Sequence, residues 1–300
     1  FCSEFGYQSF PSMEVAETFA TREQILAKAP EFEWHQKNPG GNRRIRETME
    51  RYFRPVKDVA SELLLSQFQQ ALAIQMAVDA WRAEQPRCMG TLFWQLNDNW
   101  PVASWSSTEY VHGTVVNKWK PLQYLAKRFF EPVHVTLAPD GTVSVINDTD
   151  KAIEGEVVAA YSPFDGGKEV SVKIGRVKVP ACSAVKVGKA EERPTAALRL
   201  AFLGTTYAEN FPVRQRYNDV TLPKANVKVE VDGFRVILST DKPAYWVWAN
   251  AKGVAGEFDD NAITLVPSTP RVLTFTPKSK VTPEQFKAAL TVVNLNDLTK

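Results

Sequence analysis

The order of secondary structure expected before residue 132 constrains the fold most. Residues 57–84 carry apolar side chains at spacings of three and four, which predicts one long helix. Residues 88–96 are a near-continuous apolar run, typical of a strand buried on both faces of a parallel sheet. An alternating strand at residues 1–10 and a second helix at 120–130 complete the order strand, helix, strand, helix. This order belongs to a parallel α/β architecture, and two strands cannot close such a sheet, so we expect the missing strands to come from elsewhere.

The pattern changes near Pro132, where short strands separated by turns begin. Residues 134–146 form a hairpin signal around Pro139-Asp140-Gly141, and residues 227–238 form another around Asp232-Gly233. Further short strands at similar spacing predict two successive β-sandwiches. Between the first strand and the long helix, residues 11–55 have no strong period, and we expect an irregular stretch there that is functional or mobile.

Composition excludes several classes of function. The net charge of the 300 residues is +2 with mixed signs along the chain, so no nucleic-acid partner is expected. No apolar run approaches the roughly 18 residues that span a bilayer, so no membrane partner is expected either. Cys2, Cys88 and Cys182 are too few and too scattered for a disulfide framework or a zinc site. The chain begins with Phe1, from which we expect that a preceding segment has been removed.

Glu4 is the candidate catalytic residue, because it is the one carboxylate in an aromatic-rich strand. An isolated charge in such a place is normally paired, protonated or functional. The structural alternative is an ion pair with an arginine. The functional one is a carboxylate at the mouth of a parallel barrel, where active sites collect and where glycoside hydrolysis uses two carboxyl groups.

The end of the second strand supplies candidate binding residues. Trp94 could be a platform for a sugar ring, and Asn97 and Asp98 could hold hydroxyl groups or orient neighbours. For Asp98 a helix cap or a turn is the alternative role. Six of the eight tryptophans precede residue 120, which fits either carbohydrate binding or a filled core.

Together these motifs resemble glycoside hydrolase family 2, and within it the β-mannosidases. The resemblance is specific up to about residue 133 and weak in the β domains, where Phe258-Asp259-Asp260-Asn261 is similar to the tail of the family's last domain. It is carried by Ser3-Glu4-Phe5-Gly6-Tyr7-Gln8-Ser9-Phe10-Pro11, His35-Gln36-Lys37, Cys88-Met89-Gly90-Thr91-Leu92-Phe93-Trp94-Gln95-Leu96-Asn97-Asp98-Asn99-Trp100-Pro101, Ser104-Trp105-Ser106-Ser107 and Trp119-Lys120-Pro121-Leu122-Gln123-Tyr124.

The resemblance implies a multidomain fold: the last part of a (β/α)8 TIM barrel followed by two immunoglobulin-like β-sandwich domains. The implied bounds are 1–131 for the barrel part, with strands 7 and 8 and their helices, then 132–218 and 219–300 for the sandwiches. The chain would be the C-terminal portion of a larger enzyme. Its partners would be a β-mannoside oligosaccharide and the remaining N-terminal part of the enzyme, from the same precursor or a separate chain.

The resemblance also implies roles for the candidate residues. Glu4 would be the nucleophile at the end of strand 7, and Trp94, at the end of strand 8, the aromatic wall of the mannose subsite. Asn97, Asp98 and Trp100 would join Trp94 in binding substrate. The family's acid/base is a Glu that follows an Asn at the end of an earlier barrel strand, and the resemblance implies that this strand lies upstream of Phe1, outside this chain. Glu109, the only nearby substitute, stands where the family often has Asp and is not expected to act as the acid.

The expected function is that of a retaining exo-β-mannosidase, which removes terminal non-reducing β-D-mannose and needs no cofactor or metal. The alternatives are an endo-β-mannosidase, an exo-β-glucosaminidase, or a non-catalytic fragment that needs a partner chain; the isolated chain is expected to be inactive. Residues 111–118 are longer than usual for the family, which bears on substrate length. The resemblance favours a periplasmic, secreted or lysosomal location.

Overall fold

The computed structural model describes residues 1–111, 118–213 and 215–300, which form two compact units. The first unit contains residues 1–5, 74–93 and 126–223, and the second contains 6–73, 94–125 and 224–300. The boundary crosses the long helix α5 (Val59–Arg82), which contributes to both units. The domains predicted from the sequence are three consecutive segments of the chain, and these bounds remain a prediction.

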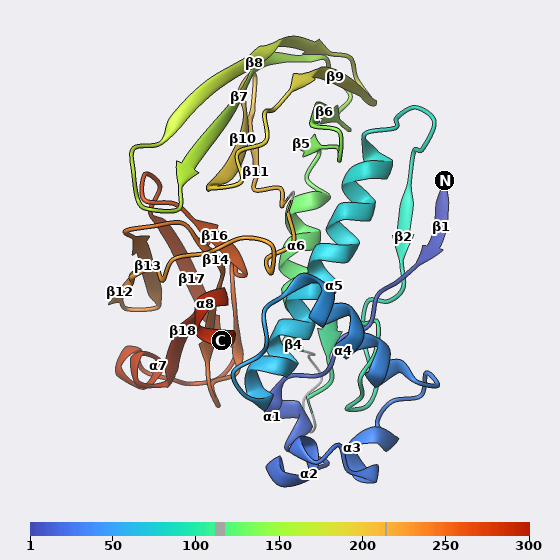
Figure 1. The fold of residues 1–300 in the computed structure, drawn as a ribbon, viewed down its shortest axis with the longest axis vertical. Helices are drawn as coiled ribbons and strands as arrows, with labels where there is room; N and C mark the ends of the chain where they lie inside the picture. The colour runs from blue at the N-terminus through green and yellow to red at the C-terminus, as the bar shows by residue number, and fades with distance from the viewer. Residues whose placement is uncertain (112–117, 214) are drawn as a thin grey trace. The chain divides into compact units, whose positions relative to one another are not determined.

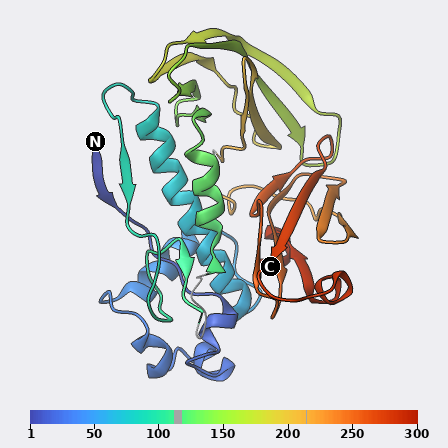
Figure 2. The same ribbon diagram turned by 180° about the vertical axis from the view of Figure 1, so that it is seen from behind.

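In the first unit, the two strands expected before residue 97 are a parallel pair. Strand β1 (Cys2–Phe5) pairs with β2 (Thr91–Phe93), with Cys2 opposite Thr91, and both views show the two strands side by side (Figures 1 and 2). Phe5 on β1 packs edge-on against Trp81 near the end of α5, with ring centroids 4.5 Å apart. The predicted order of strand, helix and strand is therefore present.

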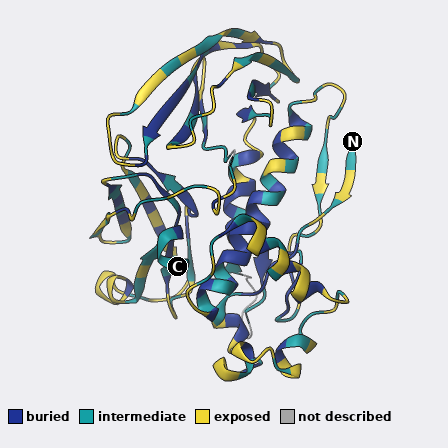
Figure 3. Cartoon of the chain, viewed as in Figure 1, coloured by how far each residue is buried: buried dark blue, intermediate teal, exposed yellow. Residues whose placement is uncertain are grey.

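The burial of this pair differs from the prediction. The residues of β1 and β2 are intermediate or exposed (Figure 3), and Leu92 in the middle of β2 is 57 % exposed. The prediction that the second strand is buried on both faces is wrong for the described residues, because their sheet contains only these two strands. A parallel sheet normally has both faces covered. Here Phe5 packs on Trp81, but Leu92 is left largely exposed.

The first sandwich completes this unit with two antiparallel sheets. One sheet has the order β5-β6-β9 and the other β11-β10-β7-β8. Val135 and Val145 of the first sheet and Val157, Leu200 and Phe202 of the second belong to one buried core. The strands are β5 (Val133–Leu137), β6 (Thr142–Asn147), β7 (Ile153–Pro163), β8 (Val170–Val179), β9 (Ser183–Lys189), β10 (Ala196–Gly204) and β11 (Tyr207–Asn210). The predicted hairpin is confirmed as β5–β6, with Gly141 in the left-handed conformation that its turn requires.

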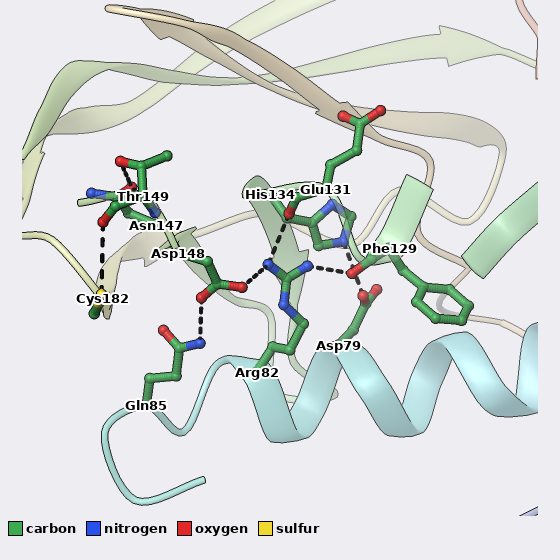
Figure 4. A network of polar contacts seen from close by, with 10 residues as sticks. All are labelled: Asp79, Arg82, Gln85, Phe129, Glu131, His134, Asn147, Asp148, Thr149 and Cys182. Carbon is green, nitrogen blue, oxygen red and sulfur yellow. Dashed lines mark hydrogen bonds and ion pairs between the residues drawn. The ribbon is translucent and has the colours of Figure 1, made fainter. Parts of the chain in front are cut away.

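Buried polar groups join helix α5 to this sandwich (Figure 4). The Asp79 Oδ1 and His134 Nε2 atoms lie 2.9 Å apart, and Arg82 donates hydrogen bonds to the Glu131 carbonyl at 2.8 Å and to Asp148 Oδ2 at 2.7 Å. Arg82 also donates to the carbonyl of Phe129. Because a buried guanidinium without acceptors is costly, this set of contacts fixes where the sandwich begins relative to the helix.

The same region contains Asn147-Asp148-Thr149, a sequence of the Asn-X-Thr type to which N-linked sugars can be attached. The Asn147 side chain is fully buried, and its amide nitrogen donates to the carbonyls of Lys151, Val179 and Pro180 at 2.8, 3.2 and 2.9 Å. In the folded chain this amide is a structural donor that holds a turn between strands, and it is not available as an attachment point.

The second unit begins with four helices in the stretch expected to be irregular. They are α1 (Met13–Ala16), α2 (Arg22–Leu26), α3 (Pro30–Trp34) and α4 (Gly41–Tyr52). The prediction of an irregular stretch is wrong, because three of these helices are too short to display an apolar period. Their sequence signals are caps instead: Ser12 and Thr21 accept a bond from the first turn, and Pro30 is the first residue of α3.

Two short strands and one helix follow in the second unit. Strand β3 (Thr108–Glu109) pairs with β4 (Lys118–Trp119), and helix α6 (Pro121–Phe129) runs from this unit into the first. The helices predicted at 57–84 and 120–130 are thus confirmed as α5 and α6. No helix among the described residues is both long enough and apolar enough to cross a membrane.

The second sandwich has sheets of order β12-β13-β17-β15 and β16-β14-β18. Its predicted hairpin is confirmed as β12–β13, which closes through Gly233 in the left-handed conformation. Phe286 of a short helix is fully buried and stacks on Phe275, with centroids 4.8 Å apart. The elements are β12 (Val227–Asp232), β13 (Arg235–Thr240), β14 (Ala244–Ala251), β15 (Gly256–Phe258), β16 (Ile263–Leu265), β17 (Arg271–Pro277), α7 (Pro283–Ala289), β18 (Leu290–Val293) and α8 (Leu295–Leu298).

The first prediction concerns the contribution of the Arg82 contacts to stability. Replacing Arg82 with alanine should lower the free energy of unfolding by about 3 kcal/mol, since a carboxylate and two carbonyls lose a buried charged donor. Arg87→Ala, at an exposed position in the same region, should change it by less than about 0.5 kcal/mol. Urea unfolding of both variants measures the difference; equal midpoints would contradict a role for Arg82 in fixing the sandwich.

Candidate active site

Glu4 lies at the edge where the parallel pair ends. It precedes Phe5, the last residue of β1, and Phe5 is paired with Phe93, the last residue of β2. The Glu4 side chain is exposed, and no arginine or lysine of the described ranges forms an ion pair with it. The contacts of this chain therefore give no support to the alternative in which Glu4 is a structural ion-pair partner.

Trp94 follows β2 directly and belongs to the second unit, where it opens a loop that closes on itself. The Gln95 amide donates to the Trp105 carbonyl at 3.1 Å, and the Ser107 amide donates to the Gln95 carbonyl at 2.9 Å. A Cβ atom at Gly6 would lie 2.5 Å from the Trp94 carbonyl oxygen, so glycine is required where the two segments touch. Trp94 remains 52 % exposed and Asn97 is exposed, so both side chains are open to a ligand.

Asp98, by contrast, is 6 % exposed and has its carboxylate occupied. Ser104 Oγ donates to Asp98 Oδ2 at 2.7 Å, Ser106 Oγ donates to the same oxygen, and Gln95 Nε2 lies 3.3 Å from Oδ1. These contacts hold the two arms of the loop together, as a carboxylate that orients its neighbours would. The role of Asp98 in substrate binding stays a prediction.

Behind Asp98 lies a buried cation that sequence reasoning did not select. Lys120 is 1 % exposed, and its Nζ donates to Ser9 Oγ and to Ser106 Oγ, each at 3.2 Å. Burial lowers the pKa of the Lys120 ammonium, while the Asp98 and Glu109 carboxylates act to raise it. Ser9 belongs to the segment that continues from Glu4, so one ammonium joins that segment to the loop that follows Trp94.

Glutamines of α5 complete this polar network. Gln70 accepts from Ser9 Oγ at 2.8 Å and donates to the Tyr7 carbonyl at 2.9 Å, and Gln67 donates to Glu109 Oε2 at 3.3 Å. The amide of Ser12 also donates to Glu109, at 2.6 Å, so this buried carboxylate is engaged by structural donors. The sequence signal for these residues is four polar side chains, Ser66, Gln67, Gln69 and Gln70, that flank Phe68 in the middle of the helix.

Trp100 is partly exposed and lies in an aromatic cluster. Its ring stacks on His35, with centroids 4.9 Å apart, and meets Trp34 edge-on at 5.5 Å. The structure therefore groups Trp94, Asn97, Asp98 and Trp100 on one loop of the second unit, whereas Glu4 belongs to the first. Of the segment predicted to be longer than usual, residues 112–117 lie outside the described residues. Within the described ranges, no three His, Cys, Asp or Glu side chains form a group that could hold a metal ion.

The second prediction concerns the contribution of the buried Lys120 ammonium to stability. Replacing Lys120 with methionine keeps the volume but leaves Asp98 and Glu109 without the buried positive charge, and should lower the free energy of unfolding by about 3 kcal/mol. Lys118→Met, two residues away, removes only a half-exposed ion pair with Glu14 and should cost less than about 1 kcal/mol. Urea unfolding followed by tryptophan fluorescence compares the two; a smaller loss for Lys120→Met than for Lys118→Met would refute this account.

Comparison with known proteins identifies relatives of nearly the whole chain. The Ig_mannosidase family, described as an Ig-fold domain, matches residues 218–298. The β-mannosidase of Rattus norvegicus is 26 % identical over 99 % of this chain, and β-mannosidase B of Aspergillus niger is 29 % identical over 60 % of it. The chain spans 37 % of the length of the rat protein and 23 % of the fungal one.

Solved structures agree with these matches. The β-D-mannosidase of Dictyoglomus thermophilum superposes on 98 % of this chain with a TM-score of 0.81 and 28 % identity, and 37 % of that structure is covered. The exo-chitosanase CsxA of Amycolatopsis orientalis has the same fold over 96 % of the chain, with a TM-score of 0.70 and 15 % identity. The resemblance to the β-mannosidases of glycoside hydrolase family 2 that the sequence motifs predict is therefore confirmed along nearly the whole chain.

Proposed function

We propose that this chain is the C-terminal part of a retaining exo-β-mannosidase and supplies its nucleophile, Glu4. The observation that carries the proposal is the position of Glu4, exposed and beside the end of a strand in a parallel pair. Carboxylates at the C-terminal edge of parallel strands are typical of (β/α)8 active sites. Similarity to β-mannosidases over 99 % of the chain supplies the substrate class.

The uncovered parallel pair supports the barrel part of this proposal. Leu92 of β2 and Phe1, which directly precedes β1, are largely exposed, although a parallel sheet is normally covered on both faces. Additional strands pairing with β1 and β2 would bury this surface and close the barrel. The remaining part of the enzyme, from the same precursor or from a separate chain, would contribute those strands together with the acid/base residue.

In the proposed reaction, the Glu4 carboxylate attacks the anomeric carbon of the terminal mannose and forms a covalent glycosyl ester. The partner carboxylic acid, about 5 Å away, protonates the departing oxygen and then activates a water molecule that releases mannose with retained configuration. Trp94 and Asn97, both exposed, are proposed to contact the mannose ring. Asp98, which is buried among serines, is proposed to act through the loop that presents Trp94 and Asn97.

Other activities within the same family are the main alternatives. An endo-β-mannosidase or an exo-β-glucosaminidase would keep the fold and the nucleophile. The Gln95-Leu96-Asn97-Asp98 sequence favours a plain mannoside as the substrate, and so supports the exo-β-mannosidase. Aryl glycosides of mannose, glucosamine, galactose and glucuronic acid separate the activities. In a third alternative, residues 1–300 are a non-catalytic piece by themselves and a partner chain completes the site.

The third prediction tests Glu4 in the full-length protein that carries this chain. Glu4→Ala should lower turnover of an aryl β-mannoside by about a thousandfold or more, because the covalent step is lost. Added azide should partly restore cleavage and yield the α-mannosyl azide, the product of direct attack at the opposite face. Glu23→Ala, at an exposed position on α2, is the matched control and should keep full activity. Near-normal turnover of Glu4→Ala would exclude it as nucleophile.

The fourth prediction concerns the chain in isolation. A sample containing only the 33.6 kDa polypeptide should not hydrolyse an aryl β-mannoside, since its described residues offer no assigned acid/base partner for Glu4. Native and denatured masses measured side by side establish whether a second polypeptide is present. Hydrolysis by a sample of this chain alone would contradict the proposal that another part of the enzyme completes the site.

A further inference from the structure

An aromatic cluster on the second unit extends beyond the residues assigned above. Phe19 and His35 stack at 3.6 Å between centroids, His35 stacks on Trp100 at 4.9 Å, and Trp100 meets Trp34 edge-on at 5.5 Å. The cluster begins at a half-buried phenylalanine and ends at Trp34, which is 62 % exposed. An indole this exposed at the end of an ordered stack is a surface to which a ligand can bind without further rearrangement.

Backbone contacts fix the cluster in place. The Ala103 amide donates to the His35 carbonyl at 2.8 Å, Gln36 forms a bridge with Ala103, and His35 Nδ1 is hydrogen-bonded to the Pro101 carbonyl. The segment that carries Trp34 is thereby joined to the loop that carries Trp94 and Trp100. Because these contacts form on folding, little ordering cost remains for a ligand that stacks on the tryptophans.

Lys37 adds hydrogen-bond donors to this surface. Its Nζ lies 3.4 Å from the centroid of the Trp34 ring and 5.5 Å from that of Trp100. With Lys37 over one face, most of the Trp34 side chain is still open to solvent. Among the described residues Lys37 forms no ion pair, so its three N–H donors are available to neutral acceptors such as hydroxyl groups.

We propose that Trp34, Lys37 and Trp100 form a subsite for the sugar on the leaving-group side of the scissile bond. Sugar rings present apolar C–H faces to aromatic rings and hydroxyl groups to donors, which is the combination found here. The inference rests on the proposed function. An exo-acting enzyme holds the terminal mannose in its catalytic subsite. A second sugar-binding surface, formed by Trp100 of the loop that carries Trp94 and by the segment of Trp34 and Lys37 that is hydrogen-bonded to this loop, then receives the next unit of the chain, a neutral hexopyranoside.

The test compares two substrates of the full-length protein that differ only in the leaving group. β-1,4-Mannobiose places a second sugar on the leaving-group side, whereas β-mannosyl fluoride places no ring there. Trp34→Ala should lower kcat/KM for mannobiose about tenfold, the equivalent of one aromatic contact, and leave the value for the fluoride within about twofold. Lys37→Met should act in the same direction, and Trp34→Phe should recover most of the loss because an aromatic face is retained.

Tyr207→Ala, which removes an exposed aromatic side chain from the first sandwich, is the matched control and should change neither value. Equal losses of Trp34→Ala on both substrates, or no loss on mannobiose, would overturn the subsite while the proposed function stands. If the unmodified enzyme cleaves neither substrate, the proposed function fails and the subsite with it. Thermal unfolding of each variant identifies any general loss of stability. Because the Trp34 side chain is largely exposed, Trp34→Ala is expected to unfold at nearly the same temperature as the unmodified protein.

Discussion

A single buried charge organises the region around the candidate site. An ammonium group removed from water needs acceptors and counter-charges, because the desolvation of an ion costs several kcal/mol. Lys120 obtains them from Ser9 and Ser106, with Asp98 and Glu109 nearby as negative charges. The segment after Glu4, the loop after Trp94 and the start of α6 must therefore come together for this one group to be tolerated.

Helix α5 also carries buried polar groups that need hydrogen-bond partners, and it carries them in both units. Its apolar side chains pack in the usual way, but its buried polar residues determine which segments lie against it. Gln67 and Gln70 bind groups of the loops near the candidate site, and Asp79 and Arg82 bind the start of the first sandwich. Each of these partners satisfies a donor or acceptor that would be costly to leave unpaired, so the helix specifies its neighbours as well as burying them.

The sequence predicted elements whose signals are local. The period of α5 and the turn glycines of both hairpins are read from neighbours within a few positions, and the two sandwiches follow from the short strands around such turns. The capping residues at the starts of α1 and α2 are equally local, but they were not predicted, because an apolar period does not reveal them. The sequence mispredicted the burial of β2, because an apolar run shows that a strand is suited to burial but does not show whether other elements of the described residues pack on it. It missed the polar network because residues 9, 70, 98, 106 and 120 come together only through tertiary folding.

The candidate binding residues include two that are exposed to solvent and one that is buried. Motif resemblance assigned Trp94, Asn97, Asp98 and Trp100 one shared role in binding substrate, since position in a motif does not distinguish contact from support. The structure separates an exposed pair, Trp94 and Asn97, from an anchored carboxylate, Asp98. The contacts of Asp98 fix the loop from which these two side chains project, and preorganisation of this kind reduces the ordering that binding and the transition state require. The serines that surround Asp98 are therefore as much a part of the proposed site as the residues that would touch the sugar.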